Sequence, residues 1–308
     1  MQLAKIAVIV NPTAGGGLAA KRWPDIAAAL KEEGLNYTHS FTDSPGHATG
    51  LTRHYLKKGY QLIVSVGGDG TNNEVVNGFF HQDEAVNNGA AVSFISSGTG
   101  SDLIRTLGIP KDYKKAIRHL INSPVRTVDV GKVAYVSNGG TSDSRYFINI
   151  AGLGLDAETV GRVNRTSKAL GGFISFFWGT FISLLLYHNR EMVITVDGKV
   201  VCNEPVTTIL IGNGRYAGGG MQLAPFAKMD DGLFDIVIMK NLKKSDLLFN
   251  LPHVYKGRHI DNPKILFLRG RSISVASLKE TLLNLDGEQP GKAPVDIELL
   301  QCSIKIKG

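Results

Sequence analysis

The most informative stretch of the sequence runs from Val64 to Thr71 and reads VSVGGDGT. An apolar segment ends in two glycines, and an aspartate, a third glycine and a hydroxyl residue follow. Because glycine has no Cβ, its backbone N–H groups can approach a polyanion closely. A helix after this loop would add the positive end of its dipole. Asp69 would then hold a cation or accept a proton. Together these groups are what a nucleotide phosphate and its Mg²⁺ require.

Two further loops carry the same kinds of residue. Asn11 to Gly17 reads NPTAGGG and follows an apolar run, and Ser96 to Asp102 reads SSGTGSD and follows another. Asparagine, proline and glycine together predict turns with positive φ angles, while hydroxyls and backbone amides suit phosphate oxygens. The first loop lacks the Gly-Lys-Ser/Thr ending of a Walker A sequence, which excludes a P-loop kinase. Asp102 is interpreted as a helix N-cap.

Two acidic turns stand in the second half of the chain. Met229 to Leu233 reads MDDGL, and Leu285 to Glu288 reads LDGE. Carboxylates beside a glycine turn can bind a hard cation through oxygen ligands. Taken alone, each turn is more typical of an ordinary surface turn.

Up to about residue 122 the chain alternates between strand and helix patterns. Each strand candidate is short and apolar on both faces, as in a parallel sheet covered by helices. The glycine-rich loops follow the first, third and fourth strands, at the ends where open α/β sheets bind ligands. Thr71 and Asn72 are candidates to cap the third helix. The predicted strands are Ile6–Val10, Tyr37–Phe41, Leu62–Val66 and Ala91–Ile95, and the predicted helices are 18–33, 47–58, 72–80, 102–107 and 112–121.

After Arg126 the pattern changes to many β-branched or alternating runs, with helices only near 156–187 and 244–256. Many strands with few helices predict an antiparallel sandwich. The expected fold class is α/β plus β. A Rossmann-like nucleotide-binding α/β domain at 1–126 would precede a β-sandwich domain at 127–293. We also expect residues 294–308 to complete the first domain, although periodicity does not show this; the role of the second domain as the lipid-substrate domain is what the family resemblance described below implies.

Composition limits the partners. The 308 residues carry a net charge of +7 and 43% of them are hydrophobic, which predicts a packed core in one large or two medium domains. The basic residues are scattered, which disfavours nucleic acid and favours a phosphorylated ligand or an anionic membrane surface. Cys202 and Cys302 lie far apart and outside any CxxC motif. They argue against a disulfide framework or a zinc site and fit a reducing cytosol.

Residues 169–187 contain no charged side chain. This length is at the lower limit of a membrane-spanning helix, which needs about 20 residues. Three glycines, two serines and a threonine weaken that interpretation. We favour a buried or groove-lining helix, then a helix that dips into the lipid interface, and least a true span.

Taken in order, these motifs resemble the diacylglycerol kinase catalytic-domain family. They are most similar to its soluble bacterial lipid kinases, which share ancestry with sphingosine and ceramide kinases. The resemblance runs from Asn11 to Glu288 and rests on Asn-Pro-x-Ala-Gly, Gly-Gly-Asp-Gly-Thr, the later Gly-Thr loop, Asp-Gly-Leu and the late Asp-Gly-Glu. Gly-Gly-Asp-Gly-Thr alone also occurs in NAD kinases. The chain departs from the family at Ser101, where the usual residue is asparagine.

The resemblance implies that ATP and an acceptor lipid meet between the two domains. ATP would bind through its phosphates to the glycine loop, and Thr42 and Thr99 would contact the nucleotide from neighbouring loops. The implied nucleotide-binding residues are Asn11, Thr42, Gly67, Gly68, Asp69, Gly70, Thr71, Asn72, Asn73, Gly98 and Thr99.

The resemblance also implies a Mg²⁺ in the second domain and a catalytic acid at its end. Asp231 would hold the ion with its side chain, and Lys228 and Leu233 would hold it with their backbone carbonyls. Glu288 would accept the proton, with Asp69 holding a catalytic metal. The sequence leaves open whether Asp69 or Glu288 is the base.

The expected reaction is transfer of the γ-phosphoryl group of ATP to the hydroxyl of diacylglycerol or a related lipid, giving phosphatidic acid or an analogue. Glycine-loop amides and Mg²⁺ would neutralise the charge of a loose transition state. The lipid would enter along residues 173–187. Scattered basic residues would hold the protein at the inner face of the membrane, as a peripheral cytoplasmic enzyme.

Three alternatives stay open. An NAD kinase would share the Gly-Gly-Asp loop and phosphorylate a soluble acceptor. A sphingoid or ceramide kinase would differ only in its lipid. A lipid-binding regulator without catalysis would share the fold, although intact Asp69 and Glu288 argue against it. The oligomeric state is also open, with a homodimer among the options.

Overall fold

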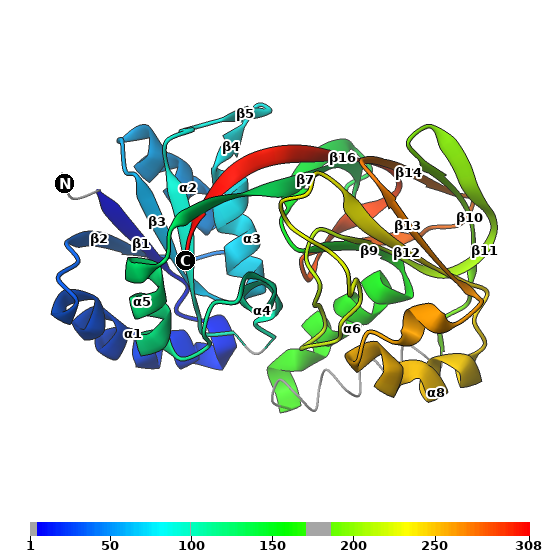
Figure 1. Cartoon of the computed structure of the whole chain (residues 1–308), viewed down its shortest axis with the longest axis horizontal. Helices are drawn as coiled ribbons and strands as arrows, with labels where there is room; N and C mark the ends of the chain where they lie inside the picture. Colours follow the sequence, from blue (N-terminus) through cyan, green and yellow to red (C-terminus); the bar gives the residue numbers. More distant parts are fainter. Residues whose placement is uncertain (1–4, 99, 171–185) are drawn as a thin grey trace. The chain divides into compact units, whose positions relative to one another are not determined.

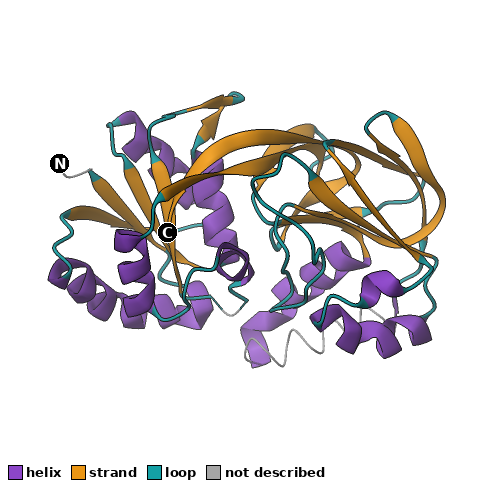
Figure 2. Ribbon diagram, viewed as in Figure 1, coloured by secondary structure: helices purple, strands orange, loops and turns teal. Residues whose placement is uncertain are grey.

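The computed structural model describes residues 5–98, 100–170 and 186–308 (Figure 1). Helices and strands alternate in the N-terminal part of the chain, and strands dominate after β7 (Val125–Ser137), as Figure 2 shows. This change of texture occurs where the sequence pattern predicts it.

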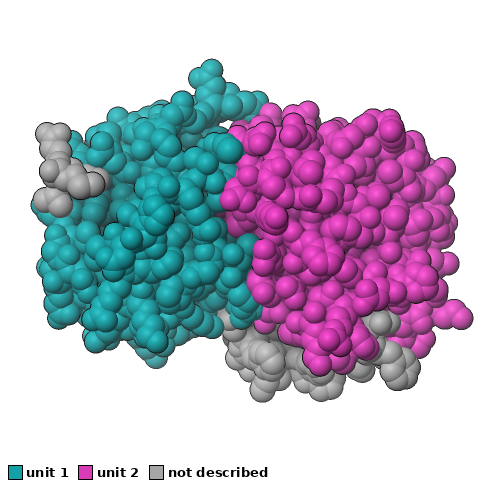
Figure 3. Space-filling model, in the orientation of Figure 1, with its two compact units in different colours: residues 1–128, 302–308 teal, residues 129–301 magenta. Residues whose placement is uncertain are grey.

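The described residues form two compact units, coloured separately in Figure 3. The first unit holds residues 1–128 and 302–308, and the second holds residues 129–301. Strand β7 and strand β16 (Glu288–Lys307) each begin in one unit and end in the other. Residues 294–301, which the sequence analysis assigns to the first domain, therefore lie in the second unit.

A parallel sheet forms the centre of the first unit. Its strands run in the order β6 (Ala91–Ser96), β3 (Leu62–Gly67), β1 (Ile6–Val10), β2 (Tyr37–Phe41), and neighbouring strands are parallel. The end of β16 continues the sheet beside β6, also in parallel. Strands β1, β3 and β6 are buried along their whole length, as predicted. Strand β2 was expected to be buried on both faces and is largely exposed, because it lies at the edge of the sheet.

Helices cover both faces of this sheet. Helices α1 (Ala14–Glu32) and α5 (Tyr113–Asn122) pack on one face through an apolar cluster, and α2 (His47–Lys57) and α3 (Asp69–Gly78) pack on the other (Figure 1). A short helix, α4 (Asp102–Leu107), follows β6, and a small hairpin pairs β4 (Phe80–His81) with β5 (Glu84–Ala85). The apolar cluster includes Val8, Val10, Trp23, Ile26, Leu30, Val64, Val66, Ile95, Ile117 and Leu120.

The start of α3 and the cap residue of α4 differ from the sequence prediction. Helix α3 begins at Asp69, so Asp69, Gly70 and Thr71 form its first turn and Gly68 is the N-cap residue. The predicted caps, Thr71 and Asn72, therefore lie inside the helix. Helix α4 begins at Asp102, with Ser101 in the N-cap position that the sequence analysis gives to Asp102. In both places the helix begins within the loop itself. The loop residues therefore also supply the first N–H groups of the helix.

Strands of the second unit pair in an antiparallel arrangement that closes on itself. Strand β11 pairs with β10 and β9, β10 with β14, β14 with β16, and β15 with both β16 and β9, which completes a ring. Strands β12 and β13 extend the sheet beyond β11, and β7 and β8 pair beside β16. The bounds are β8 (Ser142–Phe147), β9 (Ile150–Gly154), β10 (Arg190–Val196), β11 (Lys199–Gly212), β12 (Phe234–Lys240), β13 (Ile265–Gly270), β14 (Ser272–Ser277) and β15 (Leu282–Leu285).

The core of the second unit lies inside this ring. Alternate residues of each strand point inward and are buried, which is the period of two that the sequence shows. A second apolar cluster forms where α8 (Lys244–Tyr255) packs on β12 and β13, followed by the 3₁₀ turn η1 (His259–Asp261). The main cluster includes Leu153, Ile194, Ile209, Ile211, Phe234, Ile236, Ile273, Val275, Leu285, Val295 and Ile297.

Helix α6 (Leu155–Leu170) follows β9, where the sequence predicts a helix over 156–187. Most of the charge-free segment 169–187, with the expected lipid-lining residues 173–185, lies outside the described residues. Among the helices that are described, none has the length and apolar character needed to cross a membrane.

Candidate functional site

Three loops meet at the carboxyl ends of β1, β3 and β6. The side-chain amide of Asn11 donates to the hydroxyl oxygen of Thr71 at 2.8 Å, which joins the first loop to the second. The second and third loops touch through glycines, because a Cβ on Gly98 would lie 2.7 Å from the Cα of Gly68. The sequence predicts all four residues as nucleotide contacts, and the structure brings them together.

The first loop also reaches the third. Gly15 has a left-handed backbone, with φ of 62°, and a Cβ there would lie only 2.1 Å from the carbonyl oxygen of Ser97. Gly16 and Gly17 are left-handed as well, but no atom lies within 4 Å of the Cβ positions that they lack. Gly15 is therefore required for the approach of two loops, whereas its neighbours leave open space on the other side of the loop.

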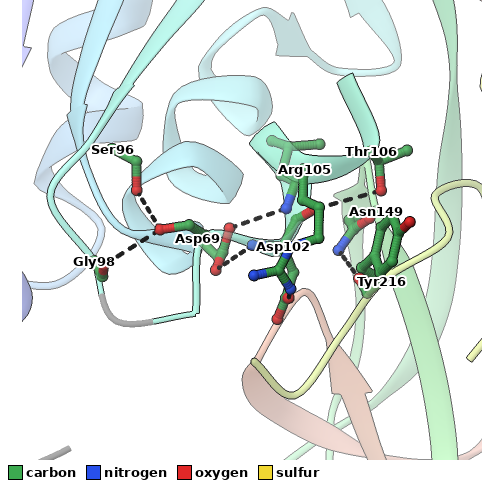
Figure 4. Close-up of polar contacts among 10 residues, drawn as sticks. Asp69, Ser96, Gly98, Asp102, Arg105, Thr106, Asn149 and Tyr216 are labelled. Carbon is green, nitrogen blue, oxygen red and sulfur yellow. Dashed lines mark hydrogen bonds and ion pairs between the residues drawn. The ribbon is translucent and has the colours of Figure 1, made fainter. Parts of the chain in front are cut away.

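The Asp69 carboxylate lies at the N-terminus of α4. It accepts the N–H groups of Asp102 and Leu103, each at 3.3 Å (Figure 4). Burial raises the pKa of Asp69, while N–H groups at Leu103, Asp102 and Ser101 and the charge of Arg105 oppose the rise. Asp69 keeps partial exposure. It therefore anchors α4 to α3 and remains accessible to a ligand or a proton.

Ser101 fixes the shape of the third loop. Its φ is 58°, and its hydroxyl lies 2.7 Å from the Ser96 hydroxyl and 3.3 Å from the Gly98 carbonyl oxygen (Figure 4). Ser101 is 3% exposed. The serine that replaces the family's asparagine thus bonds within the loop. One turn on, Arg105 pairs with Asp102 at 3.1 Å.

Three predicted nucleotide contacts are buried in α3. Thr71, Asn72 and Asn73 are 6%, 2% and 0% exposed. The side-chain oxygen of Asn72 accepts the hydroxyl of Ser65 in β3 at 2.8 Å, and that of Asn73 accepts the amide of Asn77 at 3.1 Å. Asn72 therefore links α3 to the sheet, whereas the bond between Asn73 and Asn77 lies within α3. Contact of these residues with a nucleotide stays a prediction.

Three further residues predicted to bind the nucleotide are Thr42, Gly67 and Thr99. Thr42 follows β2 at the same edge of the sheet, and its N–H donates to the carbonyl of Val10 at 2.9 Å. Gly67 lets α3 approach β3, since a Cβ there would lie 2.6 Å from the Thr71 side chain. Thr99 lies outside the described residues.

In the second unit, the turn before Glu288 is tied to the start of β9. Asp286 is 7% exposed, and its carboxylate accepts three backbone N–H groups. Ile148 donates at 2.8 Å, and Asn149 and Ile150 donate at 2.9 Å each. The N–H of Asp286 donates back to the Ile150 carbonyl at 3.0 Å. A buried carboxylate with several amide donors is strongly oriented, so this turn is not the exposed hairpin that its local sequence suggests.

The same turn is also tied to α6. The side chain of Asn284 accepts the N–H of Gly287 at 2.9 Å and donates to the Asp156 carboxylate at 2.6 Å. Gln289 donates to the Ala157 carbonyl at 3.0 Å. Burial raises the pKa of Asp156, and the bond from Asn284 opposes the rise.

Glu288 is the first residue of β16 and is partly exposed. Its neighbours on both sides, Gly287 and Gln289, are bonded to surrounding elements. The backbone that carries Glu288 is therefore fixed, while its side chain can still be reached by solvent.

In the turn that is predicted to bind a metal, both oxygens of the Asp231 carboxylate already have partners within the chain. One oxygen of Asp231 accepts the N–H of Leu233 at 3.2 Å, and the other pairs with the guanidinium of Arg269. Lys228 is exposed. Across the described ranges, no three His, Cys, Asp or Glu side chains are grouped to hold a metal ion. Because the ligand oxygen that Mg²⁺ would need faces a cationic side chain, these residues do not fit the implied ion as they stand.

Sequence reasoning missed Asn284, Asp156 and Arg269. Asn284 left one signal, since it is a polar residue between two leucines in one of the runs after Arg126 that predict strands. Asp156 follows the Gly-Leu-Gly-Leu run 152–155 and looked like the first turn of an ordinary helix. Arg269 left none, because its partner Asp231 lies far away along the chain.

Comparison with known proteins covers both units. Residues 5–133 match the diacylglycerol kinase catalytic domain, and residues 149–307 match the YegS C-terminal NAD kinase beta sandwich-like domain. These matches support a two-domain arrangement of an α/β catalytic domain and a β-rich domain.

Relatives align over nearly the whole chain. A diacylglycerol kinase of Staphylococcus haemolyticus is 31% identical over 299 residues, which is 97% of this chain and 86% of the relative. A diacylglycerol kinase of Bacillus subtilis is 31% identical over 288 residues, or 93% and 90% of the two chains. A crystal structure of a diacylglycerol kinase from Bacillus anthracis is 28% identical, has a TM-score of 0.76, and covers 100% of this chain and 98% of its own.

Proposed function

Because the chain belongs to the diacylglycerol kinase catalytic-domain family, as its motifs predicted, we propose that it phosphorylates diacylglycerol or a closely related lipid with ATP. The product would be phosphatidic acid or an analogue. Mg²⁺ would accompany ATP and neutralise charge on its phosphates.

The observation that carries this proposal is the meeting of three glycine and hydroxyl loops around Asp69, in a chain whose relatives match it over both units. The loops follow β1, β3 and β6, at the end of a parallel sheet where Rossmann-like domains bind phosphates. Backbone N–H groups and the N-terminus of α3 would hold the ATP phosphates there. Asp69, beside that N-terminus, would orient the transferred group.

Glu288 would supply the base. As the lipid oxygen bonds to the γ-phosphorus, the bond between that phosphorus and the β–γ bridging oxygen breaks, and ADP leaves. The hydroxyl proton passes to the Glu288 carboxylate. The bonds that fix Gly287 and Gln289 would hold this acid in place during the transfer.

We also propose that the protein works at the cytoplasmic face of a membrane without spanning it. The net charge of +7 supports a salt-sensitive attraction to anionic lipid. Co-sedimentation with anionic vesicles should therefore weaken as salt rises. Binding that is equal at low and high salt, or equal to neutral vesicles, would argue against this.

The direct test follows radiolabelled γ-phosphate from ATP into diacylglycerol, sphingosine, ceramide and NAD, each presented separately. We expect label in diacylglycerol. Asp69→Asn should lower turnover and weaken MgATP binding, whereas Glu288→Gln should lower turnover with MgATP binding unchanged. If both variants keep normal turnover, the assignment of the two acids is wrong.

NAD kinase activity is the second candidate. It is favoured by one finding, the match of residues 149–307 to a domain described as NAD kinase beta sandwich-like. Label in NAD and in no lipid would establish this candidate in place of the first.

A further inference from the structure

A cluster of charges surrounds the turn that the family resemblance assigns to magnesium. The guanidinium of Arg269, in β13, pairs with Asp231 in the turn and with Asp235 in β12, the second contact at 3.0 Å. Asp235 and Arg269 are directly opposite one another in the antiparallel pair of strands. One cation therefore bridges two aspartates from different positions along β12 and its preceding turn.

The bridge is partly sheltered from solvent. The Asp235 side chain is 1% exposed, the Asp231 side chain 24% and the Arg269 side chain 40%. The second oxygen of Asp235 is buried and has no hydrogen-bond partner among the described residues. A buried acid of this kind needs a nearby cation, because an unpaired charge in the interior is strongly destabilising. Arg269 is the cation that pairs directly with Asp235, and the charge of Arg215 acts on the same carboxylate.

The turn itself is closed by the chain's own groups. Asp231 uses its other oxygen on the N–H of Leu233. The preceding N–H, of Gly232, donates to the fully buried carboxylate of Asp129 at 2.8 Å. The turn thus has its shape set by backbone bonds and its negative charge compensated by a side chain.

We infer that the guanidinium of Arg269 is the resident cation of the Asp231 turn and occupies the carboxylate oxygen that the resemblance assigns to a magnesium ion. A guanidinium is permanently charged and planar, and matches two carboxylates at once. It is tethered to the neighbouring strand, whereas Mg²⁺ must shed tightly held water to enter. The second unit then needs no divalent ion to hold this turn.

Removing the arginine should create the metal dependence that the natural chain lacks. In Arg269→Met, Asp231 and Asp235 lose the guanidinium that pairs with both of them, and only the more distant charge of Arg215 still acts on Asp235. A divalent ion can then enter through the oxygens of the two acids. Lys240→Met is the matched control, because Lys240 lies on the same strand as Asp235 and forms a comparable pair with Glu204 at 2.9 Å. Arg269→Lys keeps the charge but not the planar fork.

The experiment is thermal unfolding of the full chain without nucleotide, in EDTA and in millimolar magnesium or manganese chloride. We expect the wild type and Lys240→Met to unfold at the same temperature in both. Arg269→Met should unfold at least roughly 5 °C lower in EDTA and recover with added metal. Arg269→Lys should stay independent of metal.

Two outcomes would overturn the inference. One is a saturable rise in the wild-type unfolding temperature with magnesium that Asp231→Asn abolishes. The other is an Arg269→Met protein that folds and stays indifferent to metal. If Arg269→Met does not fold, titration of the wild type with Mn²⁺ decides, since a site lost in Asp231→Asn would refute a resident arginine and its absence would support one. None of these measurements uses ATP or lipid, so they stand apart from the proposed activity.

Discussion

Two Asp-Gly turns in the second unit have the same local design and different surroundings. Asp197-Gly198 joins β10 to β11, and Asp286-Gly287 joins β15 to β16. All four residues are left-handed, with φ of 47° and 76° in the first turn and 51° and 92° in the second. Such pairs favour the two-residue turns that fit the twist of a hairpin.

The two aspartates even make the same bonds. Asp197 donates its N–H to the Ser272 carbonyl and accepts the N–H groups of Arg271 and Ser272, each at 2.9 Å. Asp286 repeats this pattern at Asn149 and Ile150 and adds a third donor. Each aspartate therefore caps the start of a neighbouring strand.

Asp197 and Asp286 differ in how far they are buried. Asp197 is exposed, whereas Asp286 is 7% exposed and its turn is further bonded to α6. A lysine follows the first turn and Glu288 follows the second. A local sequence therefore sets the shape of a turn, while the surrounding elements decide whether the turn can hold a reactive group in place.

The largest effect should come from the residue after each turn. Glu288→Gln removes the proposed base and should lower kcat by about 10²–10⁴-fold, measured as phosphate transfer to diacylglycerol. Lys199→Met, at the same place after the exposed turn, should leave kcat within twofold, roughly. Equal activity of the two variants would remove Glu288 from the mechanism.

The second largest effect should be a loss of stability when the aspartate of a turn, Asp286 or Asp197, is replaced. Asp286→Ala leaves three sheltered N–H groups without an acceptor and should lower the free energy of unfolding by about 3–5 kcal/mol. Asp197→Ala exposes its two donors to water and should cost about 1 kcal/mol or less. Urea unfolding of both variants measures the difference. Similar losses would mean that burial does not distinguish the turns.

A smaller loss of stability should be the same in both turns, at their glycines. Gly287→Ala and Gly198→Ala each force an L side chain into a left-handed conformation, at about 1–2 kcal/mol. No atom lies within 4 Å of either missing Cβ, so packing adds nothing to the cost. The two variants should therefore lose equal stability by urea unfolding. A clear excess at Gly287 would show that the buried turn has tighter surroundings than its contacts indicate.

The smallest effect should be a change with pH in the free energy of unfolding. It comes from Asp156, the carboxylate in α6 to which Asn284 of the buried turn donates a hydrogen bond. Burial raises the pKa of Asp156 in the fold, so the folded chain binds its proton more tightly than the unfolded chain. This contribution to stability is present below about pH 4, near the pKa of an unfolded aspartate. It is lost as pH rises through the folded value.

Asp156→Asn has no such proton to lose. Its stability relative to the wild type should therefore increase as pH rises from acid to neutral, in urea unfolding at a series of pH values. Curves that stay parallel would show that Asp156 has the same pKa in both states.

Much of the first unit could be predicted because its rules are local. Apolar runs gave the four parallel strands, and the glycine loops after them gave the meeting point around Asp69. The errors came from neighbours that the sequence does not show. Strand β2 is exposed because it is the last strand of the sheet. Asn72 is not a cap because α3 begins at Asp69, which places Asn72 inside the helix, where it accepts a hydrogen bond from Ser65.

The family, the order of α/β and β-rich parts, and the turns that carry Asp69, Asp231 and Glu288 can all be read from the amino-acid sequence. Glycine, proline and apolar periodicity act over a few residues, so a single chain reveals them. The contacts of each acid depend on the three-dimensional fold: amides of α4 for Asp69, a guanidinium for Asp231, and amides at the start of β9 for Asp286. These partners come from distant segments, and burial sets the strength of their bonds. Neither distance in space nor burial is written in the local sequence.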